Sequence, residues 1–181
     1  MKRLLVLILM LTAGCAVWTQ VGGLYTSEPN NYSVDLSQGW MRWGKTDHLL
    51  ISRDGVLLQN IQIIRHNVKD PLNHTKKKLA KDMLPQETAE IILDNLASNP
   101  EITDFRTLET NPMVIGGTPG FRAVYTYKNK DGLKCKSVCC GLLAGEWFYG
   151  MTYNAAERYY FDKDIETFNK VVQSFMLIKT L

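Results

Sequence analysis

The residues best suited to chemistry in this chain are four cysteines and three histidines. His66, Asp70 and His74 recur at four-residue spacing, which on one face of a helix would present a set of metal ligands. Asn67 and Pro71 lie inside that stretch and favour a loop, because proline removes a helical hydrogen-bond donor. We therefore predict no metal site here.

Motifs of the common catalytic sites do not occur in the sequence. Asp47 and His48 form half of an acid–base pair, but no serine or cysteine lies in a nucleophile motif. The Gly-x-Ser-x-Gly, His-Glu-x-x-His and phosphate-loop patterns are missing. We predict no catalytic residues, no cofactor and no enzymatic activity. An enzyme remains an alternative that requires His48, His66 or His74 beside a carboxylate in one cleft.

Three of the cysteines lie in one largely apolar segment. If residues 133–143 form a strand, Cys135 and Cys139 share a face about 13 Å apart, which is too far for a disulfide bond. Cys139 and Cys140 point to opposite faces, and no pair of Cys-x-x-Cys motifs is present to hold zinc. We predict buried free thiols that pack as small apolar groups.

The fourth cysteine, Cys15, ends a leader of distinct composition. Lys2 and Arg3 precede an apolar run from Leu4 to Leu11. A run of about eight apolar residues is typical of a cleaved signal, whereas a membrane-spanning helix needs about 20. Residues 12–15, Thr-Ala-Gly-Cys, resemble the lipobox of bacterial lipoproteins, although that family usually has Leu, Val or Ile in the first position. The resemblance implies cleavage before Cys15 and acylation of its thiol, which anchors the protein to a membrane.

Residues 1–14 are therefore predicted to be a lipoprotein signal peptide. The resemblance also implies the periplasmic face of the outer membrane, because Ala16 rather than aspartate follows the lipidated cysteine. The alternative is an ordinary secretory signal, cleaved near Ala13 or Ala16.

The charge of the remaining chain argues against a nucleic-acid partner. Without Lys2 and Arg3 the chain keeps 19 of its 21 basic residues against 18 acidic ones, a net charge of +1 instead of +3. Phosphate binding needs a clustered basic surface. The only such cluster, Lys76–Lys78, lies near Asp82 and Glu87 and indicates a solvated surface.

The length after the leader suits one domain with a single sizeable core. Residues 15–31 are rich in glycine, serine, threonine and asparagine, so we predict a flexible tether there and a single α+β domain over residues 32–181.

Hydrophobic periodicity predicts both strands and helices in that domain. The predicted strands include 32–36, a tight hairpin over 48–65 turning at Asp54-Gly55, a strand over 105–109 that turns at Asn111-Pro112, and a three-stranded meander over 121–153. The predicted helices cover 75–82, 85–99 and 162–178.

The order of these elements resembles the PsbP/Mog-type α/β/α sandwich. The matching residues are Tyr32–Leu36 with Gly39-Trp40, Asp54-Gly55 before Gln59–Arg65, Gly116 and Arg122 in the meander, and Ser174-Phe175. The resemblance implies an α+β fold, with a curved antiparallel sheet and helices packed on both faces. It further implies a non-enzymatic role that assists larger complexes, and it supplies no catalytic set.

Aromatic residues provide the candidate binding surface, which we assign to Trp40, Trp43, Tyr159 and Tyr160. The leading hypothesis is a lipid-anchored envelope accessory protein that acts through contacts with another envelope protein. The alternative is a module that binds a small molecule, such as a lipid, glycan or peptide, in an aromatic-lined pocket.

Overall fold

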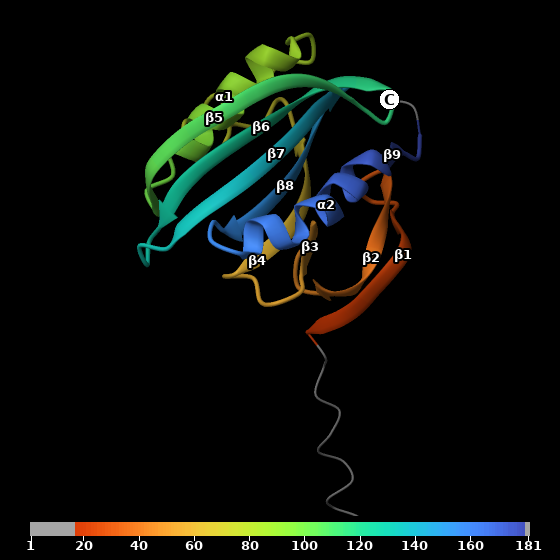
Figure 1. Ribbon diagram of the computed structural model, residues 1–181. Helices are drawn as coiled ribbons and strands as arrows, with labels where there is room; N and C mark the ends of the chain where they lie inside the picture. The colour runs from red at the N-terminus through yellow and green to blue at the C-terminus, as the bar shows by residue number, and fades with distance from the viewer. Residues whose placement is uncertain (1–16, 180–181) are drawn as a thin grey trace, which may run out of the picture.

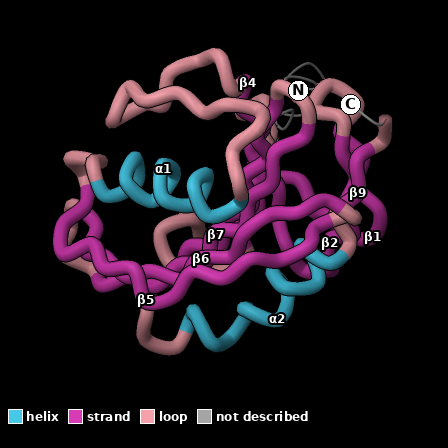
Figure 2. The backbone as a smooth tube through the Cα atoms, turned by 90° about the horizontal axis from the view of Figure 1, so that it is seen from above, coloured by secondary structure: helices cyan, strands magenta, loops and turns pink. Residues whose placement is uncertain are grey.

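The computed structural model describes residues 17–179, which form an open antiparallel sheet with one helix on each face (Figure 1, Figure 2). The strands are β1 (Trp18–Ser27), β2 (Tyr32–Trp43), β3 (Leu49–Ser52), β4 (Gln59–Asn67), β5 (Ile102–Ile115), β6 (Thr118–Asn129), β7 (Lys134–Ala144), β8 (Trp147–Ala156) and β9 (Met176–Leu177). The helices are α1 (Pro85–Ala97) and α2 (Tyr160–Gln173).

The spatial order of the strands is β1-β2-β3-β4-β8-β7-β6-β5, with β9 beside β2. Strands β1 to β4 and strands β5 to β8 are two antiparallel groups, joined where β4 pairs with β8 from Gln59 opposite Ala155 to Asn67 opposite Trp147. This arrangement confirms the predicted fold class, an α+β fold with a curved antiparallel sheet and helices on both faces.

The side chains of strand β4 pack on both faces of the sheet. Gln59, Ile61 and Ile63 are fully buried on the side of α2, whereas Ile64 and His66 face the side of α1. Side chains of a strand alternate between faces, so a sheet with apolar residues at successive positions must be covered twice.

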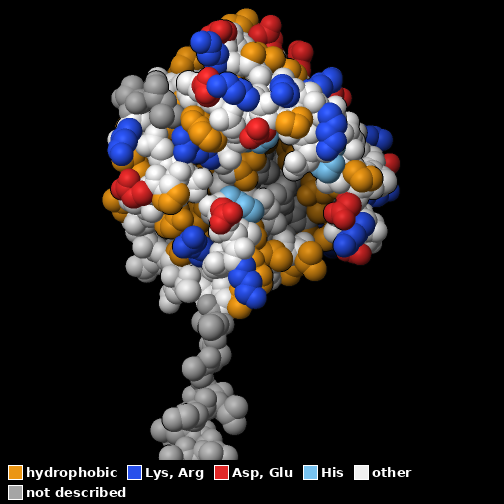
Figure 3. All heavy atoms as spheres, turned by 180° about the vertical axis from the view of Figure 1, so that it is seen from behind, with side chains coloured by type: hydrophobic (Ala, Val, Ile, Leu, Met, Phe, Trp, Pro, Cys, Tyr) orange, Lys and Arg blue, Asp and Glu red, His pale blue; other side chains and the backbone are white. Residues whose placement is uncertain are grey.

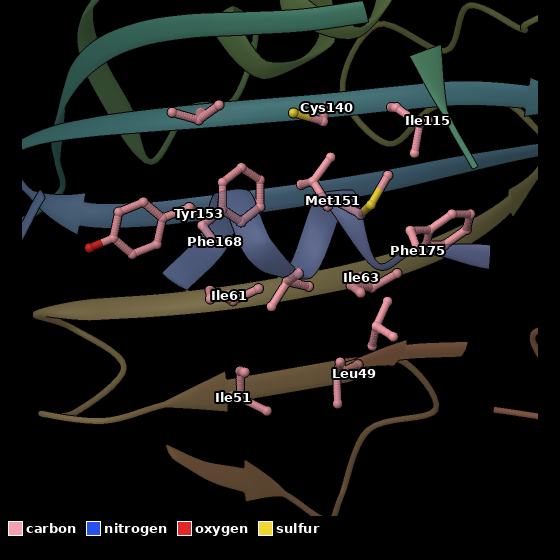
Figure 4. Close-up of a cluster of buried hydrophobic side chains, with 14 of the residues drawn as sticks. Leu49, Ile51, Ile61, Ile63, Ile115, Cys140, Met151, Tyr153, Phe168 and Phe175 are labelled. Carbon is pink, nitrogen blue, oxygen red and sulfur yellow. The ribbon is translucent and has the colours of Figure 1, made fainter. Parts of the chain in front are cut away.

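Helix α2 covers the larger core, and Figure 4 shows Phe168 beside Tyr153 and Met151, with Ile61 and Ile63 on the neighbouring strand. The rings of Tyr153 and Phe168 stack at 5.9 Å between centroids. Beyond the end of the helix, Phe175 lies between the rings of Tyr32 and Tyr149, at 5.6 and 5.7 Å. Aromatic burial on this scale is the main source of stability for such a layer.

A buried carboxylate fastens α2 to the connection between β3 and β4. Asp164 is only 2% exposed, and its two oxygens accept hydrogen bonds from Arg53 at 3.0 Å and from Gln59 at 2.8 Å. Lys163 pairs with Asp54 at 2.6 Å beside it. A buried charge is tolerated only when it is paired and hydrogen-bonded in this way.

Helix α1 covers the second core, on the opposite face. Pro85 begins the helix and Glu87 accepts a hydrogen bond from the backbone N–H of Leu84, which caps the first turn. Ala89, Ile92 and Leu93 pack over the sheet, and the loop of residues 68–84 adds three buried side chains, Val68, Leu72 and Leu79.

The predicted tether over residues 15–31 is wrong for most of its length. Residues 18–27 form strand β1, which pairs along β2 from Trp18 opposite Trp43 to Ser27 opposite Tyr32. Gly22 and Gly23 interrupt the apolar alternation, and a bulge lies at this point, so the strand period is hidden in the sequence. Cys15 and the leader lie outside the described residues.

Long-range pairing also overrides other local predictions. Residues 75–82 are irregular rather than helical, and α2 ends at Gln173 instead of 178, because Met176 and Leu177 pair with Ser33 and Tyr32. The tight hairpin at Asp54-Gly55 is instead a longer connection between Ser52 and Gln59.

Two strands are longer than predicted. Strand β2 continues beyond the predicted end at Leu36 as far as Trp43, with Gly39 at a φ of +82°. Strand β5 runs through Pro112, which pairs with Phe121 at the edge of the sheet, where a missing N–H is tolerated.

The turn between β5 and β6 offers a matched stability test. Gly116 and Gly117 have φ values of +54° and +81°, and a Cβ at Gly116 would lie 2.7 Å from the carbonyl oxygen of Phe175, whereas one at Gly117 meets nothing within 4 Å. We expect Gly117→Ala to lower the free energy of unfolding by about 1–2 kcal/mol through left-handed strain alone. Gly116→Ala should lower it by roughly a further 1–3 kcal/mol, because the turn must also move away from Phe175. Urea titrations that gave equal losses for both variants would contradict this close approach.

Candidate binding site

Helix α1 leaves part of its sheet face without a helix, because it packs on β5, β6 and β7. The α1 side of β4 and β8 carries four facing pairs: Asn60 with Asn154, Gln62 with Thr152, Ile64 with Gly150, and His66 with Phe148. We call these eight residues the open strip. Its first two pairs are polar and half-buried, and its last two border a cavity.

The polar half of the open strip is a ladder of uncharged groups. The side-chain oxygen of Asn60 accepts hydrogen bonds from Gln62 at 3.0 Å and from Asn154 at 3.2 Å. Ser137 of β7 donates to the side-chain oxygen of Asn154 at 2.9 Å. Each amide still has hydrogen-bonding capacity that a ligand can use, because a carboxamide offers two donors and accepts two bonds.

The apolar half of the open strip borders a cavity of about 130 Å³ between the sheet, α1 and the loop of residues 68–84. Figure 3 shows the molecule hollowed on this face. The residues lining the cavity carry no formal charge when His66 is neutral: Ile64, His66, Leu72, Asn73, Ile92, Asn95, Leu96, Cys139, Phe148, Gly150 and Thr152.

Two glycines make room for Phe148 in the wall of the cavity. A Cβ at Gly141 would lie 2.6 Å from Cε2 of Phe148, and one at Gly150 would lie 2.9 Å from its Cε1. The ring therefore lies across β7 and β8, roughly parallel to Phe121 with 6.4 Å between centroids. The two glycines let an aromatic surface line a cavity that ordinary side chains would fill.

The loop that closes the cavity is held against α1. The side-chain oxygen of Asn95 accepts hydrogen bonds from the backbone N–H groups of His74 and Thr75, at 2.9 and 3.3 Å. Lys77 pairs with Asp94 of α1 at 2.7 Å. These contacts fix the cavity wall opposite the sheet.

The four aromatic residues predicted as a binding surface do not form one surface. Trp40 is 1% exposed and belongs to the core, because it points inward on β2. Trp43 is half-buried and packs on Trp18 at 4.9 Å between ring centroids. Tyr159 is 65% exposed and contacts Tyr160 at 5.1 Å, at the start of α2 on the other face of the sheet.

The histidines are not brought together around a catalytic or metal centre. Burial lowers the pKa of His48, while Nε2 of His66 lies 3.2 Å from the carbonyl oxygen of Asp70 and His74 is exposed on the loop. Over residues 17–179, no group of three histidine, cysteine, aspartate or glutamate side chains is placed to hold a metal.

The predicted buried thiols are confirmed. Cys135, Cys139 and Cys140 are buried and unpaired. Burial raises the pKa of the Cys139 thiol to about 11, so it stays protonated at neutral pH and acts as an uncharged part of the cavity wall.

Sequence reasoning missed the open strip because its residues carry no strong chemical signal. The available signal was alternation, with Asn60 and Gln62 two apart on one strand and Gly150, Thr152 and Asn154 two apart on another. These residues become neighbours only through the pairing of β4 with β8, which no local pattern specifies.

Comparison with known proteins identifies solved structures with a similar fold. No protein-family model matches the chain, and no curated protein matches it by sequence. Among solved structures, cyanobacterial PsbP (CyanoP) from Synechocystis is 15% identical, with a TM-score of 0.58, over 92% of this chain and 95% of that one. The Ran-binding protein Mog1p of Saccharomyces cerevisiae is 10% identical, with a TM-score of 0.61, over 90% of this chain and 98% of its own.

These likenesses establish the PsbP/Mog-like fold. They also match the order of elements on which the resemblance in the sequence was based. Within residues 17–179, neither helix is long and apolar enough to cross a membrane.

Proposed function

We propose that this protein is a lipid-anchored accessory protein of the bacterial cell envelope, which acts by binding another envelope protein and not by catalysis. The leader ending at Cys15 supports the anchor, with the outer membrane as its favoured site. The observation that carries the binding role is the open strip, a row of side chains without Asp, Glu, Lys or Arg on the part of the sheet that α1 covers only incompletely.

The polar half of the open strip defines the chemistry of the partner. Asn60, Gln62 and Asn154 present amide groups without a charged side chain among them. Asn60 and Asn154 also border a cavity of about 320 Å³ that is lined by Glu101, Lys130 and Asp131 as well. We therefore infer that the partner presents a polar segment with hydrogen-bonding groups, because carboxamides both donate and accept hydrogen bonds. Mog1p, which shares the fold, is a Ran-binding protein, so the fold is compatible with binding another protein.

The anchor can be tested by metabolic labelling. We expect Cys15→Ser to abolish incorporation of labelled palmitate and to release the protein from membranes, because the acylated sulfur is lost. Cys135→Ser is the matched control, since Cys135 is buried in the folded domain, and this variant should keep the label. Globomycin should block processing of the unsubstituted chain, and processing that is unaffected by globomycin would point to an ordinary secretory signal.

The binding surface can be tested by photo-crosslinking in whole cells. A photoreactive amino acid at Gln62 should form a discrete adduct with another envelope protein, and the adduct should disappear in the Cys15→Ser background. The control position is Glu166, which is exposed on α2 on the opposite face of the sheet. Adducts that are identical from both positions, or missing from Gln62, would count against the open strip as the contact surface.

A second candidate function, binding of a small molecule, is favoured by the cavity beside Phe148. Its volume of about 130 Å³ is close to that of an apolar cavity of about 150 Å³ that binds benzene. The lining combines an aromatic ring with amide and hydroxyl groups and lacks Asp, Glu, Lys and Arg. This lining fits an uncharged single-ring molecule with one hydrogen-bonding group.

The second candidate can be tested by calorimetry with p-cresol and indole as probes. Both should bind more tightly than benzoate, because the lining contains no Lys or Arg to offset the loss of water around a carboxylate. Ile64→Trp, at a side chain 39% exposed beside the cavity, should weaken binding of p-cresol by about tenfold or more, or about 1.4 kcal/mol. Val114→Trp is the control on exposed β5 and should leave binding unchanged. Equal affinity in both variants would exclude the cavity.

A further inference from the structure

The first strand begins almost at the predicted anchor. Trp18 is the first residue of β1. The residue before it is already hydrogen-bonded to the folded domain, because the backbone N–H of Gly44 donates to the carbonyl oxygen of Val17 at 2.9 Å. Ala16 alone stands between Cys15 and Val17 in the sequence. The Trp18 end of the β1–β2 ribbon therefore cannot move far from Cys15.

The reach of so short a connection is set by backbone geometry. Consecutive Cα atoms are about 3.8 Å apart, so Cys15 and Val17 are separated by at most about 7–8 Å. The headgroup layer on each side of a bilayer is of similar thickness, about 5–8 Å. An acylated Cys15 would thus hold the end of β1 at the depth of the headgroups.

The side chains at that end of the ribbon suit such a position. Trp18 and Trp43 face each other across β1 and β2, with ring centroids 4.9 Å apart and ring planes at 58°, and both remain half-exposed. Tryptophan rings are enriched at the interface between membrane and water, because the apolar ring and the polar N–H find their preferred surroundings there.

We propose that the Trp18–Trp43 end of the β1–β2 ribbon contacts the bilayer at headgroup depth. This inference rests on the acylation of Cys15 in the proposed function. The opposite end of the ribbon, at residues 28–31, then lies away from the membrane, beside the C-terminal segment that β9 fastens to β2 (Figure 1).

Quenching of tryptophan fluorescence tests this contact in the full lipidated protein. Vesicles of phosphatidylcholine with bromine near the top of the acyl chains should reduce the emission, whereas bromine-free vesicles should not. The bromine-dependent loss should disappear in Trp18→Phe/Trp43→Phe. It should persist in Trp147→Phe, since Trp147 lies on β8 beneath the guanidinium of Arg65, at 3.7 Å.

Labelling with palmitate in the same samples distinguishes failure of the proposed membrane contact from failure of the proposed lipid anchor. A protein that carries the label but shows no bromine-dependent loss overturns the membrane contact and leaves the anchor standing. The same holds if the loss is unchanged in Trp18→Phe/Trp43→Phe. A protein without the label overturns the anchor and, with it, the membrane contact.

Discussion

The alternation of side chains along each strand is the constraint on which the structure depends. Apolar residues point to both faces of the sheet, so both faces must be covered. Residues 17–179 provide two helices for this, of 13 and 14 residues. Helix α2 covers one face with help from Phe175, while α1 covers three strands of the other face and the loop of residues 68–84 extends the cover. The open strip lies on β4 and β8 where this cover is incomplete, and its apolar half borders the cavity beneath α1 and the loop.

The open strip is compatible with this constraint because its side chains change from apolar to polar along the strands. Where α1 and the loop come close, Ile64 and Phe148 are apolar and line a cavity. Farther along, Asn60, Gln62 and Asn154 are polar and satisfy part of their hydrogen bonding among themselves. A strip of this kind can face water without a large apolar patch and can still bind a partner.

The fold was predictable from the sequence to the extent that local patterns coincide with tertiary contacts. The start of α1 at Pro85 and the apolar face of α2 with Phe168 and Val172 were readable, because capping and a period near four residues are local. Strand β1 was not, since its pairing with β2 includes a bulge, and neither was the strand at Met176, which forms only against Tyr32 and Ser33. The candidate site was hidden for the same reason, because the pairing of β4 with β8 assembles it.

The outer edge of β5 affects whether molecules of this protein associate with one another. A long strand at the end of a sheet offers unpaired N–H and C=O groups to any neighbouring chain, and this one runs for 14 residues. Its ladder is broken by two register shifts, between Thr103 and Arg106 and between Thr107 and Glu109, and Pro112 removes one donor. A second molecule therefore finds no continuous template along the whole of this edge, which disfavours edge-to-edge pairing of β5 between copies.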